Sequence, residues 1–148
     1  PSPESLCATT DWFRGWLDIG ASISGADYAR ANLLRLECNA KLANVFTTID
    51  VLLTPVLSTT VPKVGFIDPV RLEPRDVDQR QAQTFGFTPP FNMTGQPSMS
   101  LPLAMSAGGL PIGMMFTAKY ADEATLFRLA GQLEKELPWK DRRPPVWG

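Results

Sequence analysis

The segment FNMTGQPSMSLPLAMSAGGLPIGMMF, residues 91–116, carries the clearest fold signal in the chain. From Ser98 to Leu103, methionine and leucine alternate with serine and proline, and this period of two predicts a half-buried strand. The glycines of SAGGL, residues 106–110, predict a turn, and residues 111–119 predict the returning strand. The segment contains five methionines but no histidine, cysteine, aspartate or glutamate. The predicted hairpin therefore lacks the side chains that most often perform acid–base chemistry.

Helices are predicted before and after this hairpin. Residues 26–49 carry apolar side chains every three or four positions, and Ser24 and Asp27 supply a capping signal at the start. The apolar stripe consists of Tyr28, Ala31, Leu34, Cys38, Leu42, Val45 and Ile49. In residues 122–137, Asp122 is the expected N-cap and Pro138 the expected stop. The apolar face of this second helix consists of Leu126, Leu129, Ala130, Leu133 and Leu137.

Between these elements lie a short strand and a long connection. The apolar run DVLLTPVL, residues 50–57, predicts a buried strand whose hydrogen-bonded length is limited by Pro55. Residues 58–80 are rich in proline and charge, which predicts a long surface loop. This loop contains Asp76 and Asp78 among three arginines, and we interpret the carboxylates as a solvated face rather than as a general acid and base.

An aromatic group near the start of the chain allows two interpretations. Trp12, Phe13 and Trp16 lie close together in sequence. Packed on a core they would belong to a short amphipathic turn, and exposed they would mark a contact surface. Packing is the favoured interpretation.

Composition excludes several function classes. The chain has 148 residues, 44% of them hydrophobic, and a net charge of -1, so it offers no electrostatic attraction for nucleic acid or an anionic membrane. No apolar run approaches the roughly 20 residues of a transmembrane helix. Cys7 and Cys38 are far apart and form no CxxC motif, which favours reduced thiols in a cytoplasmic protein over a structural disulfide. Cys38 falls within the apolar stripe and is expected to be a buried thiol.

The chain contains no histidine, so catalysis by Ser-His-Asp or Cys-His groups and the usual zinc sites are excluded within it. The glycines at 108, 109 and 113 have neither of the usual phosphate-loop spacings and fit a hairpin turn better. Ser98 and Ser100 lack an activating motif, with Lys119 as the nearest candidate base, and are interpreted as outward-facing strand serines.

Four stretches together resemble the carboxy-terminal region of amidase signature enzymes. They are GADYARANLLRLECNAKLANVFTTIDVLLTPV at residues 25–56, FTPPFNMTGQPSMSLPL at 87–103, GGLPIG at 108–113 and ADEATLFRLAGQLE at 121–134. The resemblance extends from about Ser24 to Trp139 and is shared with amidases, glutamyl-tRNA amidotransferase A subunits, fatty acid amide hydrolases and nylon-oligomer hydrolases. It implies an α/β fold with mixed sheet strands packed between helices, and residues 1–148 as the carboxy-terminal part of one amidase domain.

The family hydrolyses amides with a Ser–cis-Ser–Lys triad and needs no cofactor, so the absence of histidine agrees with the resemblance. In the family this triad and its glycine- and serine-rich signature precede the region seen here. The resemblance therefore implies that this chain contains no catalytic residue, is inactive alone and contributes scaffold and part of an acyl pocket. No cofactor or metal is expected, and the expected ligand is a small-molecule amide bound by the full-length enzyme.

The resemblance also implies three residues of the acyl pocket. Counting back from Asn92, positions that match pocket-lining positions of the family are Ala82, Phe85 and Pro89. Their spacings of three and four place them on one face of the expected helix. Amidotransferase subunits carry an acidic residue at the position of Phe85, so the aromatic ring favours an apolar or aromatic acyl group. Pro89 departs from the bulkier apolar residue of many relatives and favours an early end of the helix.

Two other functions remain open at this stage. One is a non-catalytic binding or scaffold module with amidase-like architecture. The other is a small independent hydrolase that uses Ser100 and Lys119. We also expect the chain to self-associate through apolar surface that the preceding part of an amidase would cover.

Overall fold

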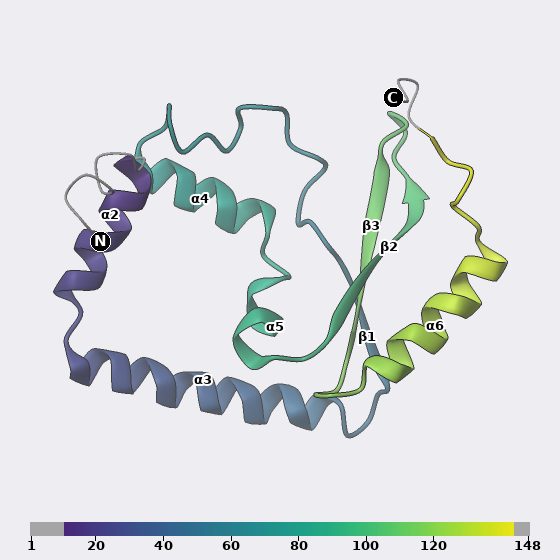
Figure 1. The fold of residues 1–148 in the computed structure, drawn as a ribbon, viewed down its shortest axis with the longest axis horizontal. Helices are drawn as coiled ribbons and strands as arrows, with labels where there is room; N and C mark the ends of the chain where they lie inside the picture. The colour runs from purple at the N-terminus through teal and green to yellow at the C-terminus, as the bar shows by residue number, and fades with distance from the viewer. Residues whose placement is uncertain (1–10, 144–148) are drawn as a thin grey trace. The chain divides into compact units, whose positions relative to one another are not determined.

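The computed structural model describes residues 11–143, so Cys7 lies outside the described residues. The elements of this region are drawn in Figure 1. In chain order they are α2 (Asp11–Ser22), α3 (Gly25–Val45), β1 (Val51–Pro55), α4 (Pro74–Thr84), α5 (Pro89–Thr94), β2 (Ser98–Met105), β3 (Pro111–Ala118) and α6 (Glu123–Glu136). These elements form two compact units, and α3 passes from the first to the second after Leu36. The described part of the first unit is residues 11–36 with 57–86, and that of the second is residues 37–56 with 87–143.

The second unit contains a three-stranded antiparallel sheet in the order β1-β3-β2. Helix α6 runs beside it (Figure 1) and contacts both β2 and β3. The mixed α/β class predicted from the sequence is confirmed, and the three strands described here are antiparallel to one another. Pro55 ends the edge strand β1, as expected for a residue without an N–H group.

The face of the sheet toward α6 forms the hydrophobic core. Its buried members are Leu101, Phe116, Ala118 and Leu126, with further apolar side chains packed around them. Met99 lies opposite Phe116 and Leu101 opposite Met114, so these cross-strand pairs share one face of the sheet. The Asp122 carboxylate accepts a hydrogen bond from the Thr125 N–H at 3.4 Å, which confirms the predicted N-cap of α6. Leu137 is 46% exposed and is not part of the core.

The predicted hairpin between β2 and β3 is present, with one irregularity. At the turn, the Ser106 N–H donates to the Leu110 carbonyl at 2.8 Å, and Gly109 adopts a φ of 77° that favours glycine. The pairing shifts by one residue between Leu101 and Ala104, which is a β-bulge beside Pro102. Because proline cannot donate to the ladder, a bulge is a favourable place for it.

In the first unit, α2 packs against α4. The Trp12 indole N–H donates to the Asp78 carboxylate at 2.9 Å, so Asp78 has a structural role in this unit. Phe13 and Trp16 are 44% and 48% exposed, so these two side chains are more exposed than the packing interpretation predicts. The loop expected over residues 58–80 ends earlier, because α4 begins at Pro74, a favoured residue in the first turn of a helix.

The predicted start of helix α3 is confirmed, but the predicted burial of its apolar stripe is wrong. The Ser24 hydroxyl donates to the Asp27 carboxylate at 2.6 Å and accepts the Asp27 N–H at 3.1 Å. No residue of α3 is buried, and the helix ends at Val45, before Ile49. Cys38 is exposed rather than buried, and Leu42 is the one residue of the apolar stripe that is half-buried in the described structure. None of the described helices combines the length and apolar character that a membrane crossing requires.

Candidate functional site

The three residues predicted to line an acyl pocket lie on two separate helices. Ala82 is exposed on α4, Phe85 caps the end of α4 and is 39% exposed, and Pro89 begins α5. Residues 85–88 interrupt the helix, so the expected single helical face through all three positions is wrong. The cause is Pro89, which has no N–H to donate and whose ring would collide with the Phe85 carbonyl in a continuous helix. The predicted early end of the helix is confirmed, and the predicted substrate contacts stay a prediction.

The sheet face opposite the hydrophobic core carries hydroxyl groups. Ser100 and Thr54 lie on either side of Met115 in adjacent strands, and Ser98 lies opposite Thr117. We call these four residues, Thr54, Ser98, Ser100 and Thr117, the hydroxyl face. Ser98 and Thr117 share a hydrogen bond at 2.8 Å between their Oγ and Oγ1 atoms. The Thr54 hydroxyl is buried and has no partner among the described residues, which leaves one hydrogen-bonding group unsatisfied on this face.

A cavity of about 320 Å³ opens beside the hydroxyl face, and we call it the hydroxyl cavity. It lies within the second unit and is lined by Val56, Thr88, Phe91, Asn92, Gln96, Ser98, Met99, Ser100 and Met115. Its volume falls in the range of small-molecule sites, which is about 300–1,000 Å³. None of these nine residues is titratable in the physiological range. The cavity can therefore offer hydrogen bonds to a neutral polar ligand but cannot itself supply a general acid or base.

Two local features position the polar groups of this cavity. Helix α5 presents Phe91 and Asn92, and it ends at Gly95 with a φ of 79°, whose N–H donates to the Phe91 carbonyl at 2.8 Å. Gly113 keeps β3 close to its neighbours, since a Cβ there would lie 3.0 Å from both the Ser100 hydroxyl and a Val56 methyl group. The wall formed by Ser100 and Val56 therefore depends on glycine at position 113.

The structure argues against a catalytic pair of Ser100 and Lys119. Ser100 lies opposite Met115, and Lys119 follows four residues later, past the end of β3. At about 3.3 Å per strand residue, the two positions are roughly 13 Å apart along the strand direction. A general base has to lie within hydrogen-bonding reach of its nucleophile. Among residues 11–143 there is also no group of three or more His, Cys, Asp or Glu side chains that could hold a metal ion.

The family model described as Amidase matches residues 12–127 of this sequence. The chain belongs to the amidase family. It is 46% identical over 123 residues to the putative amidase AmiC of Mycobacterium leprae (strain TN), and the alignment covers 83% of this chain and 26% of that protein. It is 39% identical over 104 residues to the 6-aminohexanoate-cyclic-dimer hydrolase of Paenarthrobacter ureafaciens, covering 66% of this chain and 21% of that enzyme.

A solved amidase-family structure has the same fold over this region. The structure of 6-aminohexanoate cyclic dimer hydrolase complexed with substrate superposes with a TM-score of 0.75 and 32% sequence identity. The match covers 84% of this chain and 27% of that one. The chain therefore spans about a quarter of the length of the family members that it matches.

The hydroxyl cavity was not predicted from the sequence. Ser98 and Ser100 were recognised as outward-facing strand serines, and the structure confirms that they point away from the core face. Of the cavity residues, Asn92 lies in residues 81–95, where Gly86, Pro89 and Pro90 favour a loop or a broken helix and many apolar side chains favour burial. The one available signal was the conflict between the helix-breaking residues of this segment and its many apolar side chains, which is typical of functional sites.

Proposed function

We propose that this chain acts as the carboxy-terminal part of an enzyme that hydrolyses carboxamides through a serine acyl-enzyme. In this proposal the nucleophile and the lysine base come from a preceding stretch of polypeptide, and the chain alone is inactive. The support is membership of the amidase family, together with a chain that spans 26% of a related amidase. The observation that carries the proposal is a ligand-sized cavity lined by hydroxyl and carboxamide groups but by no acid or base.

The hydroxyl cavity gives this part of the enzyme a chemical role. An amide substrate presents one C=O acceptor and, if it is not tertiary, an N–H donor. Hydroxyl groups such as that of Ser100 and the carboxamide of Asn92 can both donate and accept, so they match either group. We assign the hydroxyl cavity to the wall of the substrate site, and Ala82, Phe85 and Pro89 to the acyl pocket of the assembled enzyme.

A chimaera tests the proposal. The matched region of the Paenarthrobacter ureafaciens hydrolase is replaced by this chain, and turnover of 6-aminohexanoate cyclic dimer is measured. We expect the chimaera to retain hydrolysis, while the isolated chain and the hydrolase lacking that region show none. Circular dichroism verifies that each protein folds. A folded but inactive chimaera would favour the binding or scaffold alternative, and turnover by the isolated chain that is lost in Ser100→Ala would favour the independent hydrolase.

The predicted role of Phe85 is tested in the same chimaera. Burying an apolar acyl group against the ring contributes about 0.8 kcal/mol per methylene, so Phe85→Glu is expected to lower kcat/KM for a hexanoyl anilide by about tenfold or more. For a substrate whose acyl group bears an ammonium, kcat/KM should fall less in this variant. Phe87→Glu is the matched control, since Phe87 is 38% exposed against 39% for Phe85. Equal losses from the two substitutions would contradict an acyl-pocket role for Phe85.

A further inference from the structure

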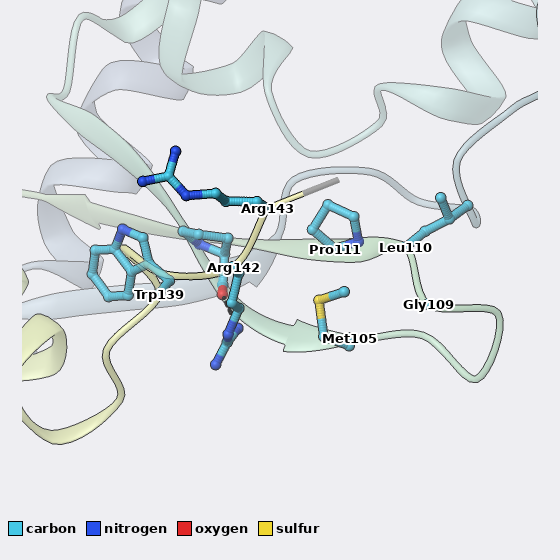
Figure 2. A pocket seen from close by; sticks show the side chains of 8 residues that line it. Met105, Gly109, Leu110, Pro111, Trp139, Arg142 and Arg143 are labelled. Carbon is cyan, nitrogen blue, oxygen red and sulfur yellow. Dashed lines mark hydrogen bonds between the residues drawn. The ribbon is translucent and has the colours of Figure 1, made fainter. Parts of the chain in front are cut away.

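A second cavity, of about 480 Å³, lies in the second unit between the tip of the β2–β3 hairpin and the residues after α6. We call it the tip cavity. Figure 2 shows the side chains that line it, with Trp139 on one side of the arginine pair and the hairpin-tip side chains on the other. It is lined by Pro102, Met105, Gly109, Leu110, Pro111, Trp139, Arg142 and Arg143, none of which lines the hydroxyl cavity.

The wall of the tip cavity is mainly apolar. Met105 and Leu110 are 48% and 50% exposed, so the hairpin tip offers apolar surface that a ligand can cover. Trp139 is half-buried and packs against the core between α6 and the sheet, which gives the opposite wall a fixed position. Met105 lies directly opposite Pro111 because the bulge shifts the register of β2 by one residue. The bulge therefore places both side chains on the same wall.

Two positive charges lie at this apolar cavity. Arg142 and Arg143 are part of its lining, which contains no aspartate or glutamate. The Arg142 guanidinium donates from Nη1 to the Pro102 carbonyl at 2.8 Å, a contact drawn in Figure 2. A guanidinium has five N–H donors, so this single bond orients the group and leaves donors for a ligand. An oriented arginine is a better anion-binding group than a mobile one, because less side-chain freedom is lost on binding.

We propose that the tip cavity binds a small apolar carboxylate. The apolar wall of Met105, Leu110 and Trp139 would cover the hydrocarbon part, and Arg142 would hold the carboxylate by a charge-assisted hydrogen bond. The volume of the cavity lies within the usual range for small-molecule sites, which is about 300–1,000 Å³. The lining contains two arginines and no aspartate or glutamate, which favours an anionic ligand over a cationic one.

This proposal does not depend on the proposed function. Amide hydrolysis releases a carboxylic acid, so the ligand class is also one that an amidase produces. Binding at the tip cavity, however, is measured on the isolated chain and requires no turnover. Loss of activity in the chimaera would leave the binding result unchanged, and a negative binding result would leave the chimaera unaffected.

The experiment is an isothermal titration of the purified chain with 4-phenylbutyrate, with the neutral 4-phenylbutyramide as the matched ligand. We expect saturable 1:1 binding of the acid and at least about tenfold weaker binding of the amide, because the amide lacks the charge. Arg142→Gln should weaken binding of the acid at least about fivefold. Arg128→Gln, an exposed arginine of α6 outside the cavity, should leave it unchanged.

A second substitution guards against a folding artefact. Leu110→Asp adds a negative charge at an exposed position of the wall and should also weaken binding of the acid, with the circular dichroism spectrum unchanged. The proposal is overturned if the acid shows no saturable binding up to about 10 mM, since binding weaker than that has little specificity. It is also overturned if the amide binds as tightly as the acid, or if Arg142→Gln and Arg128→Gln behave alike.

Discussion

Asp27 at the start of α3 is a carboxylate held in its charged form by two neighbours. The Ser24 hydroxyl and then the Arg30 guanidinium, 3.0 Å from the carboxylate, lower the pKa of Asp27 below its ordinary value of 3.8. A lowered pKa in the folded state stabilises the helix above the unfolded-state pKa, and this contribution is lost as the pH falls through the folded-state value. We expect carboxyl NMR titration to give Asp27 a pKa below 3.8 and Ser24→Ala to raise it.

An unchanged titration curve in Ser24→Ala would contradict this assignment. The matched control is Ser22→Ala, since the Ser22 hydroxyl donates to the Ile19 carbonyl at 2.7 Å and not to Asp27. An equal shift of the Asp27 pKa in both variants would indicate a general change in the helices rather than loss of one hydrogen bond.

Asp78 joins two helices of the first unit through the Trp12 indole. Replacing Asp78 by alanine leaves a half-buried N–H donor without its partner, and hydrogen bonds to charged groups contribute about 1.5–3 kcal/mol. We expect Asp78→Ala to lower the free energy of unfolding by about 1–2 kcal/mol, measured by urea denaturation of the chain. Asp76→Ala is the control, because Asp76 lies exposed on the same helix, and an equal loss there would show that the Trp12 contact contributes little.

The residues that cap the helices could be predicted from the sequence, whereas the solvent exposure of the side chains could not. Ser24, Asp27 and Asp122 were correctly identified at helix starts because a cap depends on atoms within one turn. The exposure of Cys38 depends on which other element covers the helix, and no local pattern contains that information. The hydroxyl cavity was missed for the same reason, since Val56 and Gln96 meet only through the tertiary fold.

At the scale of elements, α6 packs against the sheet through one face, and the side chains on its other face are exposed. Leu126 is 4% exposed in the core, and the adjacent Phe127 is 77% exposed. Leu126→Ala removes buried methyl groups and leaves a cavity, so we expect a loss of about 2–5 kcal/mol in the free energy of unfolding. Phe127→Ala should change it by about 0.5 kcal/mol or less, although it removes the larger side chain. Chemical denaturation of the two variants would contradict the assigned orientation of α6 if the order of the losses were reversed.

The hairpin and α6 were predicted well because their hydrophobic periods agree with their turn and cap signals. The break between α4 and α5 was predicted less well. The family resemblance implied one helix through Ala82, Phe85 and Pro89, whereas the proline divides it into two. The missing N–H and the ring of Pro89 therefore determine where the helix ends, although the spacing of the three positions suits one continuous helix.

At the scale of the whole molecule, the exposed side of α3 is the largest departure from the sequence analysis. Leu33, Leu34 and Leu36 are 61%, 58% and 55% exposed. Apolar groups of this size on one helix favour association, so we expect the isolated chain to form concentration-dependent oligomers. Light scattering coupled to size-exclusion chromatography should show that Leu34→Glu shifts the population toward monomer. A strict monomer at the highest soluble concentration would contradict the expected self-association.

The division into two units was also beyond sequence analysis. The boundary after Leu36 falls inside a continuous helix, where neither composition nor a turn signal marks it. The boundary is set by which segments contact one another, and Leu57–Gly86 joins the early residues despite its distance in sequence.

The β-bulge beside Pro102 determines where the β2–β3 hairpin can be lengthened without disturbing the core. It divides the hairpin into an inner section, which packs against α6, and an outer section, which forms the tip cavity. Adding two residues to each strand beyond Ala104 would lengthen the outer section and keep every side chain on its present side, because the pleat repeats every two residues. The tip can thus be lengthened by paired insertions, while the inner section keeps the same residues in contact with α6.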